Sequence, residues 1–543
     1  MPSGVISDTE ELLRAARMVY SGDREERALI DQLDTRLHEP LRLAIAGMVK
    51  AGKSTLLNAL LGERIAATDT AECTRVVTWY RHSPTPRITM HLRDGSESRM
   101  PIRREGGLLT FDLGGRTAEE IEWIDVGWPL DGLESLILID TPGIASLSPE
   151  TSARTTRFLT PDDAPSTADA VIYLMRHLHG SDVGFLEAFR DTAAGAGQSI
   201  CAVAVLSRSD EVGSGRIDSL LSARRVAQRY ERDGDLAALA LAVVPVAGLL
   251  AEGARTLRES EYIAFRELAG LERAAREGLL VSADRFVRES TATGLSIGVR
   301  EQLLARFGIF GVRLSAALIR GGVSSSSELS EAMVQQSGLI ELQEFVQRHF
   351  HPRSDILKAR GVVLQLQAMM RRTPKEGSEE IRAGIERFLA SAHMLDELAL
   401  LALARSRGLP LDAADARTAE RILGSDGVTP SARLGLAADA PREVIAERVL
   451  AEIDRWRVLS AWPTAAPAAL RVHRAVLRSL DGVASEVGAG RALRSPAHVE
   501  AAGGPAEGRG QDADQQREEH QRGLSGKKGL QRRALRALRH PSR

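Results

Sequence analysis

The spacing of hydrophobic positions changes twice along the chain. Between residues 41 and 246, short and nearly continuous apolar runs are separated by helical or loop segments. The runs are LRLAIAG (41–47), TRVVTWY (74–80), SLILID (135–140), AVIYLM (170–175), ICAVAVL (200–206) and ALAVVPV (240–246). Because strands that are buried on both faces read as continuous apolar runs, this pattern predicts an α/β domain with a mostly parallel sheet and helices on both faces.

Helical spacing dominates on both sides of these runs. Residues 8–38 read as one or two helices, with a capping box expected at residues 7–10. After the last run, residues 338–350 have an amphipathic pattern, and apolar positions recur at three- and four-residue steps over 381–402. A further helix is expected to begin near residues 439–441. The pattern therefore predicts an α-helical bundle in addition to the sheet domain.

Composition narrows the class of protein. The 543 residues include 43% hydrophobic, 27% charged and only 4% aromatic positions, which fits two or three domains rich in Ala and Leu. Neither a signal peptide nor a run of 18 uncharged apolar residues occurs, so no membrane-spanning helix is expected. Two cysteines, Cys73 and Cys201, favour a reducing cytosol, and the net charge of −2 gives no general attraction to nucleic acid.

The most specific motif follows the first apolar run and fits G-x-x-x-x-G-K-[ST]. With the helical residue after it, it comprises Gly47, Met48, Val49, Lys50, Ala51, Gly52, Lys53, Ser54 and Thr55. Between a strand and a helix, such a loop points backbone N–H groups at phosphate oxygens. Lys53 is expected to reach the β- and γ-phosphates, and Ser54 to offer its hydroxyl to Mg²⁺. Two of the chain's six lysines, Lys50 and Lys53, lie here, although arginine carries most of its positive charge.

A second candidate loop follows the run SLILI. It consists of Asp140, Thr141, Pro142 and Gly143. An Asp at the carboxyl end of a strand can hold Mg²⁺ through water, and the Gly143 N–H can meet a γ-phosphate, so the loop would respond to that phosphate. DTPG alone is a common turn, but its position 87 residues after Lys53 (140 − 53) supports a nucleotide site.

The run ICAVAVL is followed by a candidate base-recognition motif. The carboxylate of Asp210 can accept from both N1–H and N2–H₂ of guanine, a donor pair that adenine lacks. GTPases usually carry [Asn/Thr]-Lys-x-Asp here, so Ser207 and Arg208 are departures, although the stem of Arg208 can cover the base. Val246 and Ala247 are a weaker signal for a backbone N–H near guanine O6. A polar turn after a buried strand is the alternative reading.

Thr74 is the candidate threonine that binds Mg²⁺ and closes over the γ-phosphate. It precedes an apolar run within Glu72-Cys73-Thr74, and Thr68, Thr70 and Thr78 are alternatives. No side chain stands out as a general base, which agrees with phosphoryl transfer that rests on positioning and electrostatics.

These motifs carry a family resemblance. The run GMVKAGKSTLLNALLGERIAATDTAECTRVVTWY (47–80) resembles the GTPase domain of bacterial dynamin-like proteins, and within them the isoniazid-inducible dynamin-like proteins of mycobacteria. The resemblance covers roughly residues 41–250, continues more loosely over 337–360, and fails in the C-terminal tail. It implies a large GTPase that uses Mg²⁺ and is activated by pairing of GTPase domains, with a helical trunk that touches or remodels membrane.

The resemblance, together with the composition of the C-terminal tail, predicts an organisation and a set of partners. The expected parts are N-terminal helices that join the trunk (1–38), a dynamin-type GTPase domain (39–350, with its core at 41–250 and a helical insert at about 253–335), a helical trunk (351–485) and a disordered basic tail (486–543). The expected partners are GTP and GDP, a second copy or a paralogous dynamin-like protein, and an anionic membrane surface, without nucleic acid. The expected location is cytoplasmic and peripheral at the inner face of the cell membrane.

Two positions depart from the eukaryotic dynamins, which usually carry Gln and Ser where this chain has Val49 and Lys50. The water-positioning glutamine and the bound monovalent cation of those proteins are therefore in doubt here. The hypothesis is that the ammonium of Lys50 compensates charge at the bridge between the β- and γ-phosphates. Lys50 thus joins Lys53 and Thr74 as a candidate catalytic residue.

Three alternatives remain open from the sequence. The helices can belong to an accessory domain of another P-loop GTPase, including a ribosome- or RNA-associated regulatory one, although no compact RNA-binding module is evident after residue 260. The apolar patch at 306–313 either contacts membrane or packs in the interior. An inactive P-loop scaffold is disfavoured by the intact Lys53, Ser54, Asp140 and Asp210.

Overall fold

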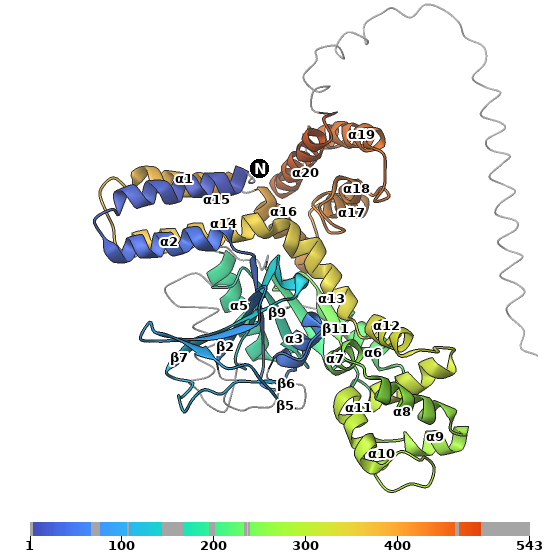
Figure 1. Cartoon of the computed structure of the whole chain (residues 1–543). Helices are drawn as coiled ribbons and strands as arrows, with labels where there is room; N and C mark the ends of the chain where they lie inside the picture. The colour runs from blue at the N-terminus through green and yellow to red at the C-terminus, as the bar shows by residue number, and fades with distance from the viewer. Residues whose placement is uncertain are drawn as a thin grey trace, which may run out of the picture. The chain divides into compact units, whose positions relative to one another are not determined.

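A mixed β-sheet forms the centre of the protein. The computed structural model describes residues 4–66, 76–105, 108–143, 167–194, 201–232, 236, 239–391, 393–461 and 466–489. Within these residues, nine strands form one sheet in the order β11-β10-β9-β1-β8-β2-β7-β3-β4 (Figure 1). They are β1 (Leu41–Gly47), β2 (Val77–His82), β3 (Arg87–Leu92), β4 (Glu97–Met100), β7 (Ile121–Trp128), β8 (Leu136–Asp140), β9 (Ala170–Met175), β10 (Ala202–Ser207) and β11 (Val243–Val246). A separate hairpin pairs β5 (Arg103–Glu105) with β6 (Leu108–Thr110).

Five neighbouring strands run parallel, namely β11, β10, β9, β1 and β8. β2 is antiparallel to β8, β7 is parallel to β2, and β3 and β4 continue the sheet in antiparallel pairs. The predicted mostly parallel sheet is therefore confirmed. Since parallel strands end at the same edge, the carboxyl ends of β1, β8, β9, β10 and β11 lie along one side of the domain, where ligands bind in such folds.

The strands between residues 87 and 128 were not predicted, because polar residues interrupt their apolar pattern. In β7, Asp125 is only 7% exposed, and its carboxylate forms an ion pair with Arg81 Nε of β2 at 2.6 Å. A buried charge is tolerated when it is paired. The ion pair thus permits a buried strand whose sequence lacks the apolar pattern of a strand.

Helices surround the sheet, as the sequence predicts. Those nearest to it are α3 (Lys53–Leu61), α5 (Gly180–Ala194), α6 (Ser219–Arg232), α7 (Gly248–Arg255) and α13 (Leu339–Phe345). α3 contacts β1, β8, α7 and α13, whereas α6 contacts β11. After α13 the chain continues through a π-helical turn, η4 (Val346–Phe350), and a 3-10 turn, η5 (His351–Arg353).

A helical segment separates α7 from α13. It consists of α8 (Glu259–Gly270), α9 (Arg273–Leu279), α10 (Ala283–Phe286), α11 (Ile297–Arg320) and α12 (Ser326–Gln336). Among the described residues, α11 alone is long and apolar enough to cross a membrane by length and composition, which the sequence analysis did not expect. It is kinked at Gly308 and packs on α7 and α8. Phe307 and Phe310 are at most 2% exposed, so the buried alternative for the patch at 306–313 is confirmed for these two residues.

A helical bundle joins the N-terminal helices to the first two helices of the chain after η5 (Figure 1). It contains α1 (Gly4–Val19), α2 (Arg24–His38), α14 (Ser354–Arg372) and α15 (Glu379–Ser391). Leu13, Leu33 and Leu366 are at most 2% exposed in its shared apolar core. The helix α1 begins at Gly4, so the capping box expected at residues 7–10 is wrong, because these residues already lie inside the first turns.

Three of the five helices that remain among the described residues meet at a buried carboxylate. The five are α16 (His393–Arg407), α17 (Ala413–Ile422), α18 (Pro430–Leu434), α19 (Arg442–Ser460) and α20 (Pro467–Glu486). Glu397 accepts hydrogen bonds from Arg433 Nη1 at 2.6 Å and Ser479 Oγ at 2.7 Å. Burial alone would raise the pKa of Glu397, but its bonds to His393, Arg433 and Ser479 lower the pKa to about 2. This carboxylate therefore stays ionised and links α16, α18 and α20.

Candidate nucleotide-binding site

The P-loop connects the carboxyl end of β1 to the first turn of α3. Gly47 has φ 147°, and a Cβ there would lie 2.3 Å from the carbonyl oxygen of Leu174 in β9. Gly52, directly before α3, has φ 96°, and Lys50 has φ 62°. Both values favour glycine, so Lys50 adopts a backbone conformation that is costly for a residue with a side chain. Such strain at a loop is typical of functional sites.

Lys53 is folded back onto its own loop. Its Nζ donates to the carbonyl oxygens of Gly47 at 3.2 Å and Met48 at 3.3 Å, and the residue is 9% exposed. Burial lowers the pKa of Lys53, while the nearby Asp140 carboxylate opposes this shift. The ammonium is thus directed toward the loop interior, where the phosphates of a nucleotide bind in P-loop proteins.

Asp140 ends β8 beside the start of α3. Its Oδ2 accepts a hydrogen bond from Ser54 Oγ at 3.0 Å, whereas Oδ1 is buried without a hydrogen-bond partner among the described residues. Burial raises the pKa of Asp140 to about 6, against the lowering effects of Lys53 and Ser54. A hydroxyl and a carboxylate with a free oxygen are ligands that Mg²⁺ prefers, so these two residues fit a magnesium site.

The rest of the second loop lies against the P-loop. Thr141 Oγ1 donates to the carbonyl oxygen of Ile45 at 2.9 Å, which fixes the start of the loop on β1. A Cβ on Gly143 would lie 2.5 Å from Cγ2 of Val49. Glycine therefore lets the two loops touch, and a larger residue would push them apart. Pro142, between Thr141 and Gly143, is buried.

The expected base motif forms one wall of a pocket of about 140 Å³. Its lining includes Ala51, Gly52 and Thr55 from the P-loop side, Ser207, Arg208 and Asp210 after β10, and Val246 and Gly248 after β11. Ser207 Oγ donates to the Met175 carbonyl oxygen at 3.1 Å, which anchors the motif on β9. The structure thus brings together residues that lie more than 150 positions apart in the sequence.

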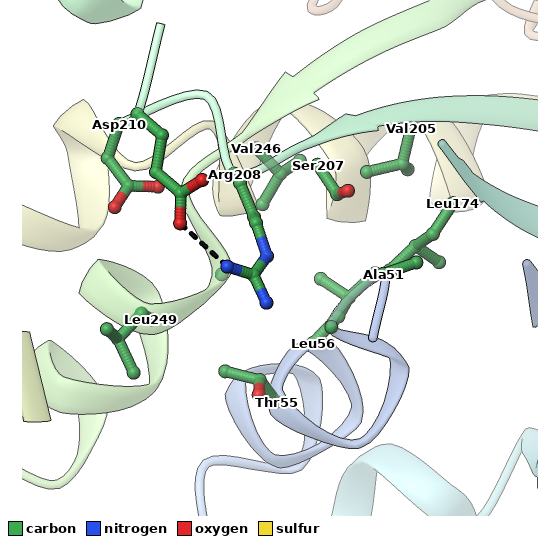
Figure 2. A pocket seen from close by; sticks show the side chains of 13 residues that line it. Ala51, Thr55, Leu56, Leu174, Val205, Ser207, Arg208, Asp210, Val246 and Leu249 are labelled. Carbon is green, nitrogen blue, oxygen red and sulfur yellow. Dashed lines mark hydrogen bonds and ion pairs between the residues drawn. The ribbon is translucent and has the colours of Figure 1, made fainter. Parts of the chain in front are cut away.

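Arg208 crosses this pocket. Figure 2 shows its side chain between Asp210 on one side and Thr55 and Leu56 on the other. Its Nη2 donates to the carbonyl oxygen of Lys50 at 3.1 Å, and its Nη1 to Glu211 Oε1 at 2.7 Å. Glu211 was not identified from the sequence, although its position beside Asp210 was a usable signal. The planar guanidinium therefore bridges the base motif and the P-loop.

Two expected site residues, Ala247 and Thr74, are not found among the described residues that line the pocket. Ala247 is buried, and its N–H donates to the Ser337 carbonyl oxygen at 2.9 Å, so it does not face the pocket, whereas Gly248 does. Thr74 lies outside the described residues, as do its alternatives Thr68 and Thr70. Thr78 is buried in β2, opposite Asp140 in the antiparallel register.

Comparison with known proteins agrees with this geometry. Residues 42–196 match the family model described as 50S ribosome-binding GTPase. The isoniazid-induced protein IniC of Mycobacterium tuberculosis is 42% identical over 462 residues, which are 85% of this chain and 93% of that protein. A bacterial dynamin-like protein of Nostoc punctiforme is 32% identical over 114 residues, 19% of this chain and 16% of its own. A solved structure of an oligomerised bacterial dynamin pair aligns over 90% of this chain and 76% of its own, with 12% identity and a TM-score of 0.33.

The P-loop and its sheet, the GTPase family model and the match to IniC define a dynamin-like protein with a P-loop GTPase domain. At this identity and coverage the family is established. The chain belongs to the family of the isoniazid-induced protein IniC of mycobacteria.

The buried carboxylate of Asp210 predicts a measurable dependence of stability on pH. Burial raises the pKa of Asp210 from its ordinary 3.8 to about 6, and the charge of Glu211 acts in the same direction. Because the folded-state pKa is raised, the native state loses stability as pH rises from about 4 to 6, and the full cost is present above pH 6. In the nucleotide-free protein, Asp210→Asn should raise the free energy of unfolding by about 2–3 kcal/mol at pH 7.5.

Urea titrations of both proteins at pH 7.5 and pH 4 check this prediction. The difference between variant and native protein should shrink toward zero at pH 4, where both side chains are neutral. An equal difference at the two pH values would contradict the assignment of a buried, ionised Asp210.

Proposed function

We propose that this protein hydrolyses GTP to GDP and phosphate and couples hydrolysis to self-assembly and membrane remodelling. The observation that carries the hydrolytic part is the shared pocket, in which the P-loop, Asp210 and the end of β11 meet, next to the free Oδ1 of Asp140. The membrane part rests on the family and on the helical bundle that α1 and α2 form with α14 and α15.

Each residue receives a role from its position. The backbone of Gly47 to Thr55 surrounds the phosphates, and Lys53 exchanges its two carbonyl contacts for phosphate oxygens. Asp210 accepts from N1–H and N2–H₂ of guanine, while the Arg208 guanidinium covers the base plane. Gly143 presents its N–H where the γ-phosphate ends, because it already touches Val49 of the P-loop.

Ser54 and Asp140 would hold Mg²⁺, together with Thr74 from the loop before β2. The ion would supply positive charge to the β- and γ-phosphate oxygens. The chain's own part is to keep the Ser54 hydroxyl and the Asp140 carboxylate in place. Their direct hydrogen bond of 3.0 Å supports this role, because it keeps the two oxygen atoms next to each other.

The proposed partners are a second copy or a paralogous dynamin-like protein, and an anionic membrane at the cytoplasmic face. Pairing of two GTPase domains across their nucleotide faces would order the Thr74 loop and position the attacking water. A ribosome- or RNA-linked role is the competing function. GTP hydrolysis without binding to liposomes would favour it.

Hydrolysis and sedimentation in the same samples test the proposal. GTP turnover should occur with no ATP turnover, and the protein should sediment with anionic liposomes but not with neutral ones. Lys53→Ala should lower hydrolysis by about 100-fold or more, since it removes a charged contact to the transferred phosphate. Its circular dichroism should stay native, because the core of the α1, α2, α14 and α15 bundle contains no residue of α3.

The outcomes separate the two functions. GTP turnover without liposome binding would contradict the membrane role and favour the RNA-linked one. Normal hydrolysis by Lys53→Ala would contradict the assigned site.

Asp210→Asn tests base selection. The carboxylate accepts two hydrogen bonds from guanine, and the amide replaces one acceptor with a donor, so GTP affinity should fall by about 100-fold or more. Xanthine carries a carbonyl where guanine has its 2-amino group, so XTP should bind the variant better than GTP does. Unchanged preference for GTP over XTP, measured by competition with a fluorescent nucleotide, would contradict the role of Asp210.

Lys50→Ala tests the proposed charge compensation. Lys50 is exposed on the P-loop, and the described residues offer its ammonium no carboxylate partner, so it is available to the phosphates. The variant should lower kcat about tenfold or more, with a smaller effect on GTP affinity, and added K⁺ should restore part of the rate. Lys375→Ala, in the helical bundle, is the control. Hydrolysis by Lys50→Ala at the native rate would remove this role.

A further inference from the structure

A second cavity, of about 430 Å³, lies at the opposite end of the parallel strands. It shares no lining residue with the nucleotide pocket. Its walls come from the first halves of β1, β8 and β9, the last turn of α3, the 3-10 turn η2 (Asp131–Leu133) and the junction of α13 with η4. A cavity of this size is within the range of small-molecule sites.

The lining is mostly aliphatic. Leu60 and Leu61 of α3, Leu130 before η2 and Leu136 of β8 face the cavity and are only half-buried, above a floor of buried strand residues such as Leu43. Half-exposed leucines around one hollow leave apolar surface in contact with water. A hydrocarbon chain in the cavity would cover this surface, and each methylene group that it buries would favour binding.

Polar groups gather at the rim. Arg255, at the end of α7, donates from Nη2 to Gln343 Oε1 at 3.4 Å, and Gln347 lies one turn further along. The described residues contain no carboxylate ion pair for Arg255, so most of its five N–H donors are available. Asp131, in the exposed turn η2, is the acidic residue on the rim.

We propose that this cavity binds a free, single-chain amphiphile with an anionic head group. Its hydrocarbon chain lies against the leucines and its head group pairs with the Arg255 guanidinium. The apolar lining excludes a polar metabolite as the occupant, and the cationic rim favours an acid over an alcohol. The site does not depend on GTP hydrolysis and is distinct from attachment to a membrane surface.

The location connects two parts of the chain. α3 begins with Lys53 and Ser54 of the P-loop and ends with Leu61 in this cavity. On the other side, Val346 opens the π-helical turn that leads into α14. π-Helical turns frequently occur at functional sites, and this one forms a wall of the cavity. An occupant would therefore contact both the helix that follows the P-loop and the π-helical turn that precedes the bundle helix.

Dodecanoate is the probe, with dodecanol as its neutral counterpart, both kept below the concentration at which they aggregate. Displacement of a dansyl-labelled undecanoic acid from the full-length protein should give saturable binding of dodecanoate at one site. Arg255→Gln should weaken dodecanoate about tenfold and leave dodecanol unchanged. Asp131→Asn should leave dodecanoate binding equal or tighter. Arg225→Gln, on the exposed face of α6, is the matched control.

Two filling variants test the cavity itself. Leu130→Phe and Leu136→Phe each add volume from a different wall, so at least one should remain folded and lose both ligands, whereas Leu221→Phe, on exposed α6, should bind normally. GTP affinity should be native in these variants, which separates this site from the nucleotide pocket. No saturable binding to the native protein, binding retained in a folded filling variant, or equal loss of both ligands in Arg255→Gln would each overturn the proposal.

Discussion

The parallel pairing of β1 with β8 and β9 is the constraint on which the nucleotide site depends. It places Ile45 beside Asp140 and Gly47 beside Leu174, and the same direction of β10 and β11 places Ser207 beside Val246. Motifs that are distant in sequence therefore end at one edge. The close approach of β1 to β9 leaves no room for a side chain at Gly47. Strand packing therefore requires glycine at this position, in addition to any requirement of phosphate binding.

The site contains charges that the protein's own described residues satisfy only in part. Lys53 contacts backbone carbonyls, Asp140 keeps one buried oxygen unpaired, and Asp210 is buried with its pKa raised. Each group is destabilised relative to water, and each lacks a partner that GTP with its metal ion carries. In the proposed function, nucleotide binding would relieve costs that folding has already imposed, and the same groups would give selectivity for guanine and for phosphate.

The sequence alone was sufficient to predict the parts of the fold that follow from local residue patterns. Strands buried on both faces read as apolar runs, and the P-loop has a fixed spacing, so the sheet and its central motif were predictable. β7 was not, because its buried Asp125 is compensated by Arg81 on a neighbouring strand. The bridge from Arg208 to the Lys50 carbonyl spans 158 positions and depends on the left-handed conformation of both residues, which no local pattern signals.

A single buried carboxylate, that of Asp169, also connects the sheet to the helical bundle. Asp169, just before β9, accepts from Arg36 Nη2 of α2 at 3.0 Å and from the Arg42 N–H of β1 at 2.9 Å. Gly361 of α14 leaves the space for this guanidinium, since a Cβ there would lie 2.9 Å from Nη2. Breaking a buried ion pair by removing one partner costs about 3–5 kcal/mol. The last turn of α2 and the first residues of β1 are therefore held together through Asp169, which fixes the start of the central strand against the bundle.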